Sequence, residues 1–554
     1  MSAFCEKLIE AGWLAAIIMA PLFFNVYSSR TFEPDKTSLI RTLALVMVAA
    51  WLVIRAERLR AGTAERARIE GPAVPAGAQL RGLADRWSRS NPLILPTLGL
   101  AAVYLISTIA SVSPGISLLG SYTRMQGTLA TFSYIVIFLL TASTMRTRAQ
   151  VERAITTALV TSFPVAFYGM IQHYFLDPLP WIGDVTTRVA SNMGNSIFVG
   201  AYLITVIPLA IARVAGHTAR LSGELGRRGR IGLYGGIVLS LLAFAAAWGL
   251  AFELGAKTLI EGKFQGTLTP EMLKASDANF MAALIVTAAV VLAWWLAGLL
   301  LAKKRPGLFL LIGIYSFLLA LQTLTLLFTQ SRGPLLGFLA GLFTLALLYA
   351  LVRGARQLAL ATMSAAAVGL LLLVLFNVAA DTSMAGLRNI PYIGRLGQVF
   401  QTEEGTGKVR VLIWQGALQL VLPHSPLWSP TTGSDILNPI RPLIGYGPET
   451  IYIAYNPFYP PELGHIESRT ATPDRSHNET FDALVTTGVI GWIAENILFL
   501  SVLYFGLKWL ALVNSARERN ILIALWYSGG LVMTLLLGLT IGWHFLGVAL
   551  PAGM

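Results

Sequence analysis

The chain has 554 residues, of which 55% are hydrophobic and only 12% are charged, and its mean hydropathy is +0.66. Soluble proteins carry about a quarter charged residues, so this composition excludes an ordinary soluble protein. The formal net charge of +13 would suggest nucleic acid as a partner, but the basic residues cluster in short loops between apolar runs, as in membrane proteins. Cys5 is the single cysteine, which excludes a disulfide framework and a cysteine metal site.

Apolar runs of membrane-spanning length recur along the whole chain and predict an all-α polytopic membrane protein. The first run is predicted to remain as a helix, because no small-residue cleavage site follows it. We expect roughly thirteen transmembrane helices, at 9–27, 38–56, 93–112, 128–145, 154–172, 195–213, 231–252, 279–302, 307–328, 335–352, 358–379, 486–507 and 521–545.

The charges of the loops predict how these helices are oriented. Alternate loops are basic, for example 146–153, 213–230 and 303–305, whereas the loops between them carry few basic residues or both signs. Basic loops face the cytoplasm. We therefore expect the N-terminus inside and the candidate site residues named below on the outer face.

The same orientation leaves one long outer loop at 380–485, between N-terminal transmembrane helices at 1–379 and C-terminal transmembrane helices at 486–554. About 100 residues is too long for a simple connector, so we expect this loop to contain short helices and to cap an active-site cavity. A smaller outer loop at 253–278 is expected to help to cover it. The long loop also offers candidate sugar-stacking or interfacial tyrosines, namely Tyr446, Tyr455 and Tyr459.

Arg332 lies in Phe328–Pro334, between two apolar runs with almost no polar loop. An arginine near bilayer depth is costly unless it faces protein, water or an anion. Ser331 and Gly333 suit a helix break whose freed backbone N–H groups can point at an anion. A guanidinium can bind two phosphate oxygens at once, so Arg332 is a candidate phosphate ligand. The alternative is an interfacial arginine that extends its charge to water.

Three further outer arginines are weaker candidates of the same kind. A turn rich in glycine, asparagine and serine follows Arg188, and it leads into the next span. Arg124 has a similar setting, and Arg410 opens an amphipathic helix of the long loop. The alternatives are ordinary interfacial charges for the first two and an ion pair with Glu403 or Glu404 for Arg410.

His477, within the polar segment Asp474–Glu479, is the candidate for proton transfer. The unperturbed pKa of histidine is about 6.5, close to working pH. Arg475 is a neighbouring cation, and Asp474 or Glu479 could orient the imidazole. The alternative is a structural histidine. The sequence contains no GxxxxGK[ST], HExxH or CxxC motif, which argues against ATP hydrolysis and a conventional zinc site.

Several motifs follow one another in a fixed order between about 120 and 510. They are the Arg188–Gly200 turn, Thr329–Gly333 at the start of a span, Arg410–Ala417, Leu443–Thr450, Ser476–Asn478 and Leu484–Gly491. This ordered set, with its long outer loop, resembles the O-antigen ligase and polymerase family of bacterial envelope proteins.

The resemblance implies an enzyme that moves a glycan from an undecaprenyl-diphosphate carrier to an acceptor hydroxyl, without nucleotide sugar, metal or other cofactor. It implies a multi-pass protein of the bacterial cytoplasmic (inner) membrane, with its active site on the extracytoplasmic face. Arg188 and Arg332 would hold the diphosphate, and His477 would act as the general base. The possible supporting residues are Arg124, Arg410, Arg475 and Glu479.

The resemblance leaves several functions open. The family includes lipid A–core ligases, O-antigen or exopolysaccharide polymerases and protein O-oligosaccharyltransferases, so the acceptor is a lipid, a glycan or a protein. An alternative function from another class of protein is transport of a small anion, for example inorganic carbon. A transporter is expected to carry ionisable residues near the midplane of the membrane and paired broken helices. A scaffold in a glycan-export complex is a third. The cytoplasmic insert at 57–91 departs from a compact ligase.

Overall fold

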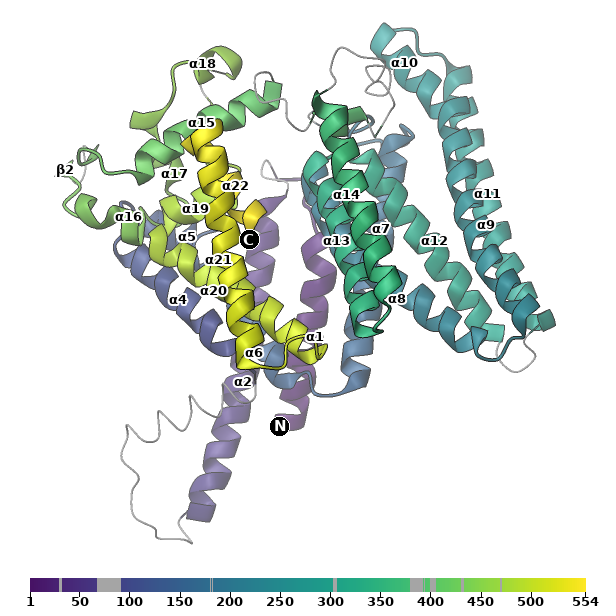
Figure 1. Cartoon of the computed structure of the whole chain (residues 1–554), viewed down its shortest axis with the longest axis horizontal. Coiled ribbons are helices and arrows are strands. Elements are labelled where there is room, and N and C mark those ends of the chain that lie inside the picture. Colours follow the sequence, from purple (N-terminus) through teal and green to yellow (C-terminus); the bar gives the residue numbers. More distant parts are fainter. Residues whose placement is uncertain are drawn as a thin grey trace. The chain divides into compact units, whose positions relative to one another are not determined.

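The computed structural model describes residues 1–28, 32–66, 91–179, 181, 183–301, 306–378, 392, 394–398, 405–429, 433–468 and 471–554. Within these residues the chain is almost entirely helical (Figure 1). The strands of the described part are β1 (Trp428–Ser429) and β2 (Gly433–Ser434), which pair antiparallel. The predicted all-α fold is confirmed.

Ten helices of the described part are long and apolar enough to cross a membrane. They are α2 (Glu33–Arg66), α7 (Arg148–His173), α8 (Ser196–Ser222), α9 (Arg227–Ala251), α11 (Pro270–Leu301), α12 (Pro306–Phe328), α13 (Arg332–Val352), α14 (Arg356–Val378), α20 (Gly488–Trp509) and α21 (Ala516–Thr540). Two shorter apolar helices are α4 (Ile94–Ile109) and α6 (Thr128–Thr144), and α1 (Ser2–Leu22) covers the first apolar run. Each predicted span therefore coincides with a helix, and the polytopic membrane prediction is confirmed.

The long segment between α14 and α20 contains short helices, as predicted. They are η4 (Gly394–Gln398), α15 (Gly405–Val421), η5 (Asn438–Ile440), α16 (Arg441–Ile444), α17 (Ile451–Ala454), η6 (Asn456–Phe458), α18 (Leu463–Ile466) and α19 (Glu479–Thr486). Other short helices are α5 (Pro114–Leu119), η1 (Ser191–Met193), η7 (Trp543–Phe545) and α22 (Leu546–Gly553).

The predicted loop at 253–278 is largely helical, so this expectation is wrong. Helix α9 continues through η2 (Phe252–Ala256, one turn of π-helix) into α10 (Lys257–Gln265), and α11 begins at Pro270. Charged residues suggested a loop, but Lys257 and Glu253 pair at 2.7 Å with helical i,i+4 spacing. Such pairs stabilise a helix that extends beyond its apolar part.

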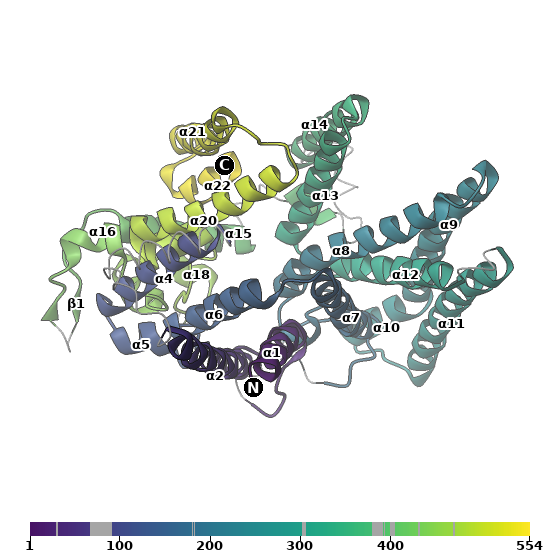
Figure 2. The same ribbon diagram turned by 90° about the horizontal axis from the view of Figure 1, so that it is seen from below.

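The helices form two compact units. Unit 1 comprises 1–16, 25–146 and 400–554, and unit 2 comprises 17–24 and 147–399. In unit 2, α9, α11 and α12 lie side by side, and α12 also packs against α7 and α8 (Figure 2).

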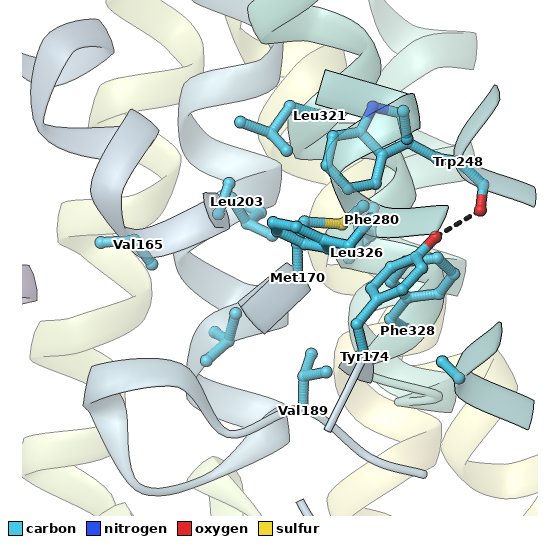
Figure 3. Close-up of a cluster of buried hydrophobic side chains, with 14 of the residues drawn as sticks. Val165, Met170, Tyr174, Val189, Leu203, Trp248, Phe280, Leu321, Leu326 and Phe328 are labelled. Carbon is cyan, nitrogen blue, oxygen red and sulfur yellow. Dashed lines mark hydrogen bonds between the residues drawn. The ribbon is translucent and has the colours of Figure 1, made fainter. Parts of the chain in front are cut away.

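The core of unit 2 is a cluster of large apolar side chains from α7, α8, α9, α11 and α12. Figure 3 shows Met170, Leu203, Trp248 and Phe280 packed together, with the Tyr174 hydroxyl donating a hydrogen bond to the Trp248 carbonyl. Within a bilayer such packing, rather than removal of apolar surface from water, holds helices together. The cluster fixes the end of α7, from which the candidate anion site is built.

The core of unit 1 lies between α15, α17 and α19. Trp414, Phe481 and the aromatic rings of Tyr446 and Tyr455 belong to it. Tyr446 is 2% exposed and Tyr455 is 0% exposed, so neither ring offers a face to a sugar. The prediction that these two tyrosines stack on sugars is therefore wrong.

Candidate functional site

The guanidiniums of two predicted arginines are associated with two helix N-termini that touch each other in unit 2. Arg332 is the first residue of α13, and the Arg188 Nη2 donates to the Ser196 hydroxyl, at the first residue of α8, over 2.9 Å. The two helices meet at Gly200 and Pro334, so closely that a Cβ at Gly200 would lie 2.7 Å from the Pro334 Cβ. Because the N-terminal end of a helix carries a partial positive charge, two such ends and two guanidiniums form a strongly anion-attracting region.

The loop that carries Arg188 is tied to the segment between α12 and α13. The Val189 N–H donates to the Phe328 carbonyl over 3.3 Å, and the Gln330 side-chain amide donates to the Thr187 carbonyl over 3.0 Å. These bonds flank Arg188 on both sides. The structure therefore brings together two sequence regions about 140 residues apart that each supply an arginine.

The end of α7 holds the same loop from the other side through a buried glutamine. The Gln172 side-chain oxygen accepts the N–H groups of Ala190, over 3.0 Å, and Ser191, over 2.6 Å. Ser191 also donates its hydroxyl to the Val165 carbonyl over 2.7 Å. Buried polar groups are costly unless they are paired, so this network favours one conformation of the loop.

His173 continues this network and was not selected from the sequence, where it only marks the end of a span. Its Nδ1 lies 2.7 Å from the Thr186 carbonyl, and its Nε2 lies 3.0 Å from the Tyr392 hydroxyl. A carbonyl can only accept, so Nδ1 carries the proton and Nε2 accepts from the tyrosine. The ring stacks between Phe252 and Phe328, at centroid distances of 4.4 and 3.8 Å. His173 is thus a positioning residue for the Arg188 loop.

The short helix η4 contacts Arg332 directly, and no sequence motif predicts this contact. The Arg332 Nη1 donates to the Gln398 carbonyl, and its Nη2 donates to the Gln398 side-chain oxygen over 2.9 Å. Arg395 of the same helix donates to the Gln330 carbonyl over 3.1 Å. The guanidinium fork of Arg332 therefore holds two oxygen atoms in the way that it would hold two phosphate oxygens.

His477 lies in unit 1, on an exposed turn just before α19. Its φ of 54° is left-handed, a strained region for a residue with a side chain. Hydrogen bonds fix the backbone on both sides. The Ser476 N–H and hydroxyl each donate to Asp482 Oδ1 over 2.7 Å, Trp414 Nε1 donates to the Ser476 carbonyl over 3.0 Å, and the Asn478 side chain caps α19. The imidazole is exposed on a rigid support.

Several non-glycine residues with a left-handed backbone conformation lie near the candidate residues in the sequence. The described part contains eight such residues. Four of the eight are close to the candidate residues: one is itself a candidate, and the other three lie within three positions of one. These four are Met125, Ser191, Gln330 and His477. Strained residues of this kind tend to occur at functional sites, so their distribution favours these segments as the site.

Arg124 and Arg475, in unit 1, are both engaged by carboxylates. The Arg124 Nε lies 2.6 Å from Asp474 and 3.6 Å from Glu33. The Arg475 Nη2 lies 3.2 Å from Glu449. Burial alone would lower the pKa of Arg475, but the charges of Glu449 and other carboxylates outweigh it and raise this pKa. Both arginines are therefore held by carboxylates within an acidic cluster.

Arg475 faces a cavity of about 300 Å³ in unit 1. The carboxylates that line it are Glu449, Asp474, Glu479, Asp482 and Glu495. Burial raises the pKa of Glu479, and the neighbouring Asp482 raises it further, while Arg475 offsets part of this shift. Burial also raises the pKa of Asp482, and hydrogen bonds from Ser476 offset part of that shift. Such an acidic cavity suits hydroxyl groups better than phosphate. Within the described part of the chain, no group of three or more His, Cys, Asp or Glu is arranged to hold a metal ion.

Arg410 is exposed on α15, and its expected partners Glu403 and Glu404 lie outside the described residues. The candidate residues thus form two groups, each within one unit. Arg188 and Arg332 belong to unit 2, whereas unit 1 holds the remaining candidates, namely Arg124, Arg410, Arg475, His477 and Glu479.

Comparison with known proteins shows that part of the chain is similar to a known family. Residues 316–494 match a family model described as O-antigen ligase. No curated protein and no solved structure was found to match the chain. The matched region runs from α12 to α20 and includes Arg332 and His477, whereas Arg188 precedes it. This match and the ten apolar helices support a glycosyltransferase-like role in a membrane: the chain is a multi-pass membrane protein, and its residues 316–494 are similar to the O-antigen ligase family.

Proposed function

We propose that the chain is an integral membrane glycosyltransferase that moves a glycan from an undecaprenyl-diphosphate carrier to an acceptor hydroxyl, without a metal ion and with inversion of the anomeric centre. Arg188 and Arg332 bind the diphosphate, and His477 is the general base. The reaction takes place on the extracytoplasmic face of the bacterial cytoplasmic membrane. The family match supports the reaction class.

The meeting of the α8 and α13 N-termini is the observation that carries this proposal. The Gly200–Pro334 contact and the bonds on either side of Arg188 set two guanidiniums at the positive ends of two membrane helices. A diphosphate gains negative charge on the oxygen that leaves the sugar. Donors that are already oriented towards such charge stabilise the transition state without reorganising.

Gln398 explains how Arg332 is kept oriented before the donor binds. A guanidinium has five N–H donors, and two of those of Arg332 are directed at Gln398 oxygens. In the proposed reaction, diphosphate oxygens replace at least one of these acceptors. Donor binding and the η4 contact therefore compete for the same side chain.

His477 removes the proton from the acceptor hydroxyl in the proposed mechanism. The acceptor oxygen attacks the anomeric carbon opposite the diphosphate, the carbon–oxygen bond to the diphosphate breaks, and its electron pair leaves with the phosphate. The proton remains on the imidazole. The exposed imidazole and its rigid support suit this role, because a general base must be held within hydrogen-bond reach of the proton that it takes.

The supporting residues have different roles in this proposal. Arg124 and Arg475 hold the segment that carries His477 through their ion pairs with Asp474 and Glu449. Glu479 lines the acidic cavity beside Arg475, where it can accept hydrogen bonds from a glycan. Arg410 remains a candidate donor ligand on the surface of α15.

The test uses purified protein in detergent with a labelled undecaprenyl-diphosphate oligosaccharide and a panel of lipid, glycan and protein acceptors, with and without EDTA. Transfer by wild type, unaffected by EDTA and lost in Arg332→Ala and His477→Ala, is the expected result. The productive acceptor distinguishes a ligase from a polymerase or a protein glycosyltransferase. Arg353→Ala, at the opposite end of α13, is the control for loss of an arginine.

The two variants are expected to fail in different ways. His477→Ala should still bind labelled donor, whereas Arg332→Ala should not. Full transfer by either variant, with Arg353→Ala also active, would remove that residue from the site. Binding of donor without transfer to any acceptor would favour the scaffold, and neither binding nor transfer would favour the transporter.

A further inference from the structure

Unit 2 contains a second cavity, larger than the acidic one, lined by residues of α9, α11 and α12. Its volume is about 660 Å³, and its lining is predominantly apolar. Trp294 forms its floor, with Leu233, Val290 and Phe309 around it. We refer to this cavity as the α9 slot.

The α9 slot exists because α9 has glycines where side chains would fill it. A Cβ at Gly232 would meet no atom within 4 Å, and a Cβ at Gly236 would just touch the Trp294 ring at 3.5 Å. The Trp294 Nε1 donates to the Ser240 hydroxyl over 2.8 Å, and that hydroxyl donates to the Gly236 carbonyl over 2.7 Å. The polar groups of the floor are thus satisfied within the protein, so the slot suits an apolar occupant.

One end of the slot is strongly positive. Arg228 lines it, and Arg227 and Arg230 lie in the same first turn of α9. The N-terminal end of a helix already carries a partial positive charge, so three arginines there repel one another and the helix. Within the described part of the chain, no carboxylate forms an ion pair with any of the three. An anion at this position would relieve the repulsion.

The α9 slot is far from the candidate diphosphate site. The head group of a lipid bound in the slot therefore cannot reach Arg332. Phe309 lies near the start of α12, and Arg332 follows the end of that helix at Phe328. With a rise of 1.5 Å per residue, Phe309 and Phe328 are about 29 Å apart, close to the thickness of the hydrocarbon core. The charged end of the slot therefore belongs to the other membrane face, where the basic loops gather.

We propose that the α9 slot binds an acyl chain of an anionic phospholipid of that leaflet, with the lipid phosphate on Arg228. The apolar lining and the volume of about 660 Å³ accommodate the chain, and the arginine supplies charge complementarity. A glycan donor is the less suitable occupant, because its diphosphate would lie at the opposite face from Arg332. This site is independent of the proposed transfer reaction.

Native mass spectrometry of the delipidated full-length protein tests the proposal, with phosphatidylglycerol and phosphatidylcholine of identical chains as probes. Wild type should retain phosphatidylglycerol in preference to phosphatidylcholine. Gly232→Phe, which fills the slot, should reduce retained phosphatidylglycerol at least tenfold. Gly235→Phe is the matched control, because Gly235 also has nothing within 4 Å of a Cβ but does not line the slot.

Exposed arginines supply a second pair of variants, which tests the head-group contact without altering the helix packing. Arg228→Gln should lower the preference for phosphatidylglycerol about fivefold, the usual effect of one basic residue at an anionic lipid surface. Arg230→Gln, which does not line the slot, should lower it less. Equal retention of the two lipids by wild type, or equal losses in the members of either pair, would overturn the proposal.

Discussion

Gly200→Ala tests whether the contact between α8 and α13 sets the geometry of the anion site. The added Cβ would lie 2.7 Å from the Pro334 Cβ and 2.8 Å from its Cγ. Carbon atoms in contact are about 3.5–4.0 Å apart, so the two helix N-termini must separate by about 1 Å. The proline ring cannot rotate away as a flexible side chain would.

A displacement of 1 Å in a reacting group can cost about 100-fold in rate. We therefore expect Gly200→Ala to lower kcat/KM for transfer from labelled undecaprenyl-diphosphate oligosaccharide by about 100-fold. Overpacking should also destabilise the helix pair by about 1–3 kcal/mol, so the melting temperature in detergent is measured alongside. Donor affinity, measured separately, should fall because Arg188 and Arg332 no longer fit one diphosphate.

Gly337→Ala is the matched control, because Gly337 lies on α13 and faces α8 in the same helix pair, but its Cβ would lie 3.4 Å from the flexible end of Ile204. This variant should retain activity within about threefold, since a methyl group at that distance can be accommodated. If Gly200→Ala were as active as Gly337→Ala, the spacing of the two N-termini would not matter to the reaction. The diphosphate site proposed at these two N-termini would then lose its main support.

Other expectations follow from single side chains. Arg332→Lys should lower kcat/KM by roughly 30-fold, about 2 kcal/mol, because one ammonium cannot replace the two hydrogen bonds of the fork. Gln398→Glu should raise the KM for the donor about tenfold in steady-state assays, since a carboxylate would pair with Arg332, whereas Gln398→Ala should not. Burial raises the pKa of Asp482, so the folded protein binds this proton more tightly than the unfolded chain, and stability falls as pH rises past the unfolded pKa of about 3.9. Asp482→Asn keeps the oxygen that accepts hydrogen bonds from Ser476 but does not titrate. The melting temperature of this variant, measured relative to wild type, should therefore increase between pH 4 and 7. A difference that stays constant with pH would contradict the raised pKa of Asp482.

The apolar runs were sufficient to predict the helices, because a bilayer requires about 20 apolar residues and leaves few alternatives. The same reasoning selected Arg332, which stands where two spans adjoin, and the segment around His477, where charges gather before a span. It failed at 253–278, where the charges form i,i+4 pairs along a helix instead of marking a loop. It also failed for Tyr446 and Tyr455, because a loop of this length builds its own core.

The sequence by itself determined that the chain is a helical membrane protein and which arginines and histidine deserve testing, since these depend on local composition and motif order. Only the tertiary structure decided that the Arg188 loop is bonded to the segment before α13, that Gln398 contacts Arg332, and that Arg124 pairs with Asp474. These contacts join residues far apart in the chain. Their formation depends on how whole helices pack, and no local pattern of residues encodes that packing.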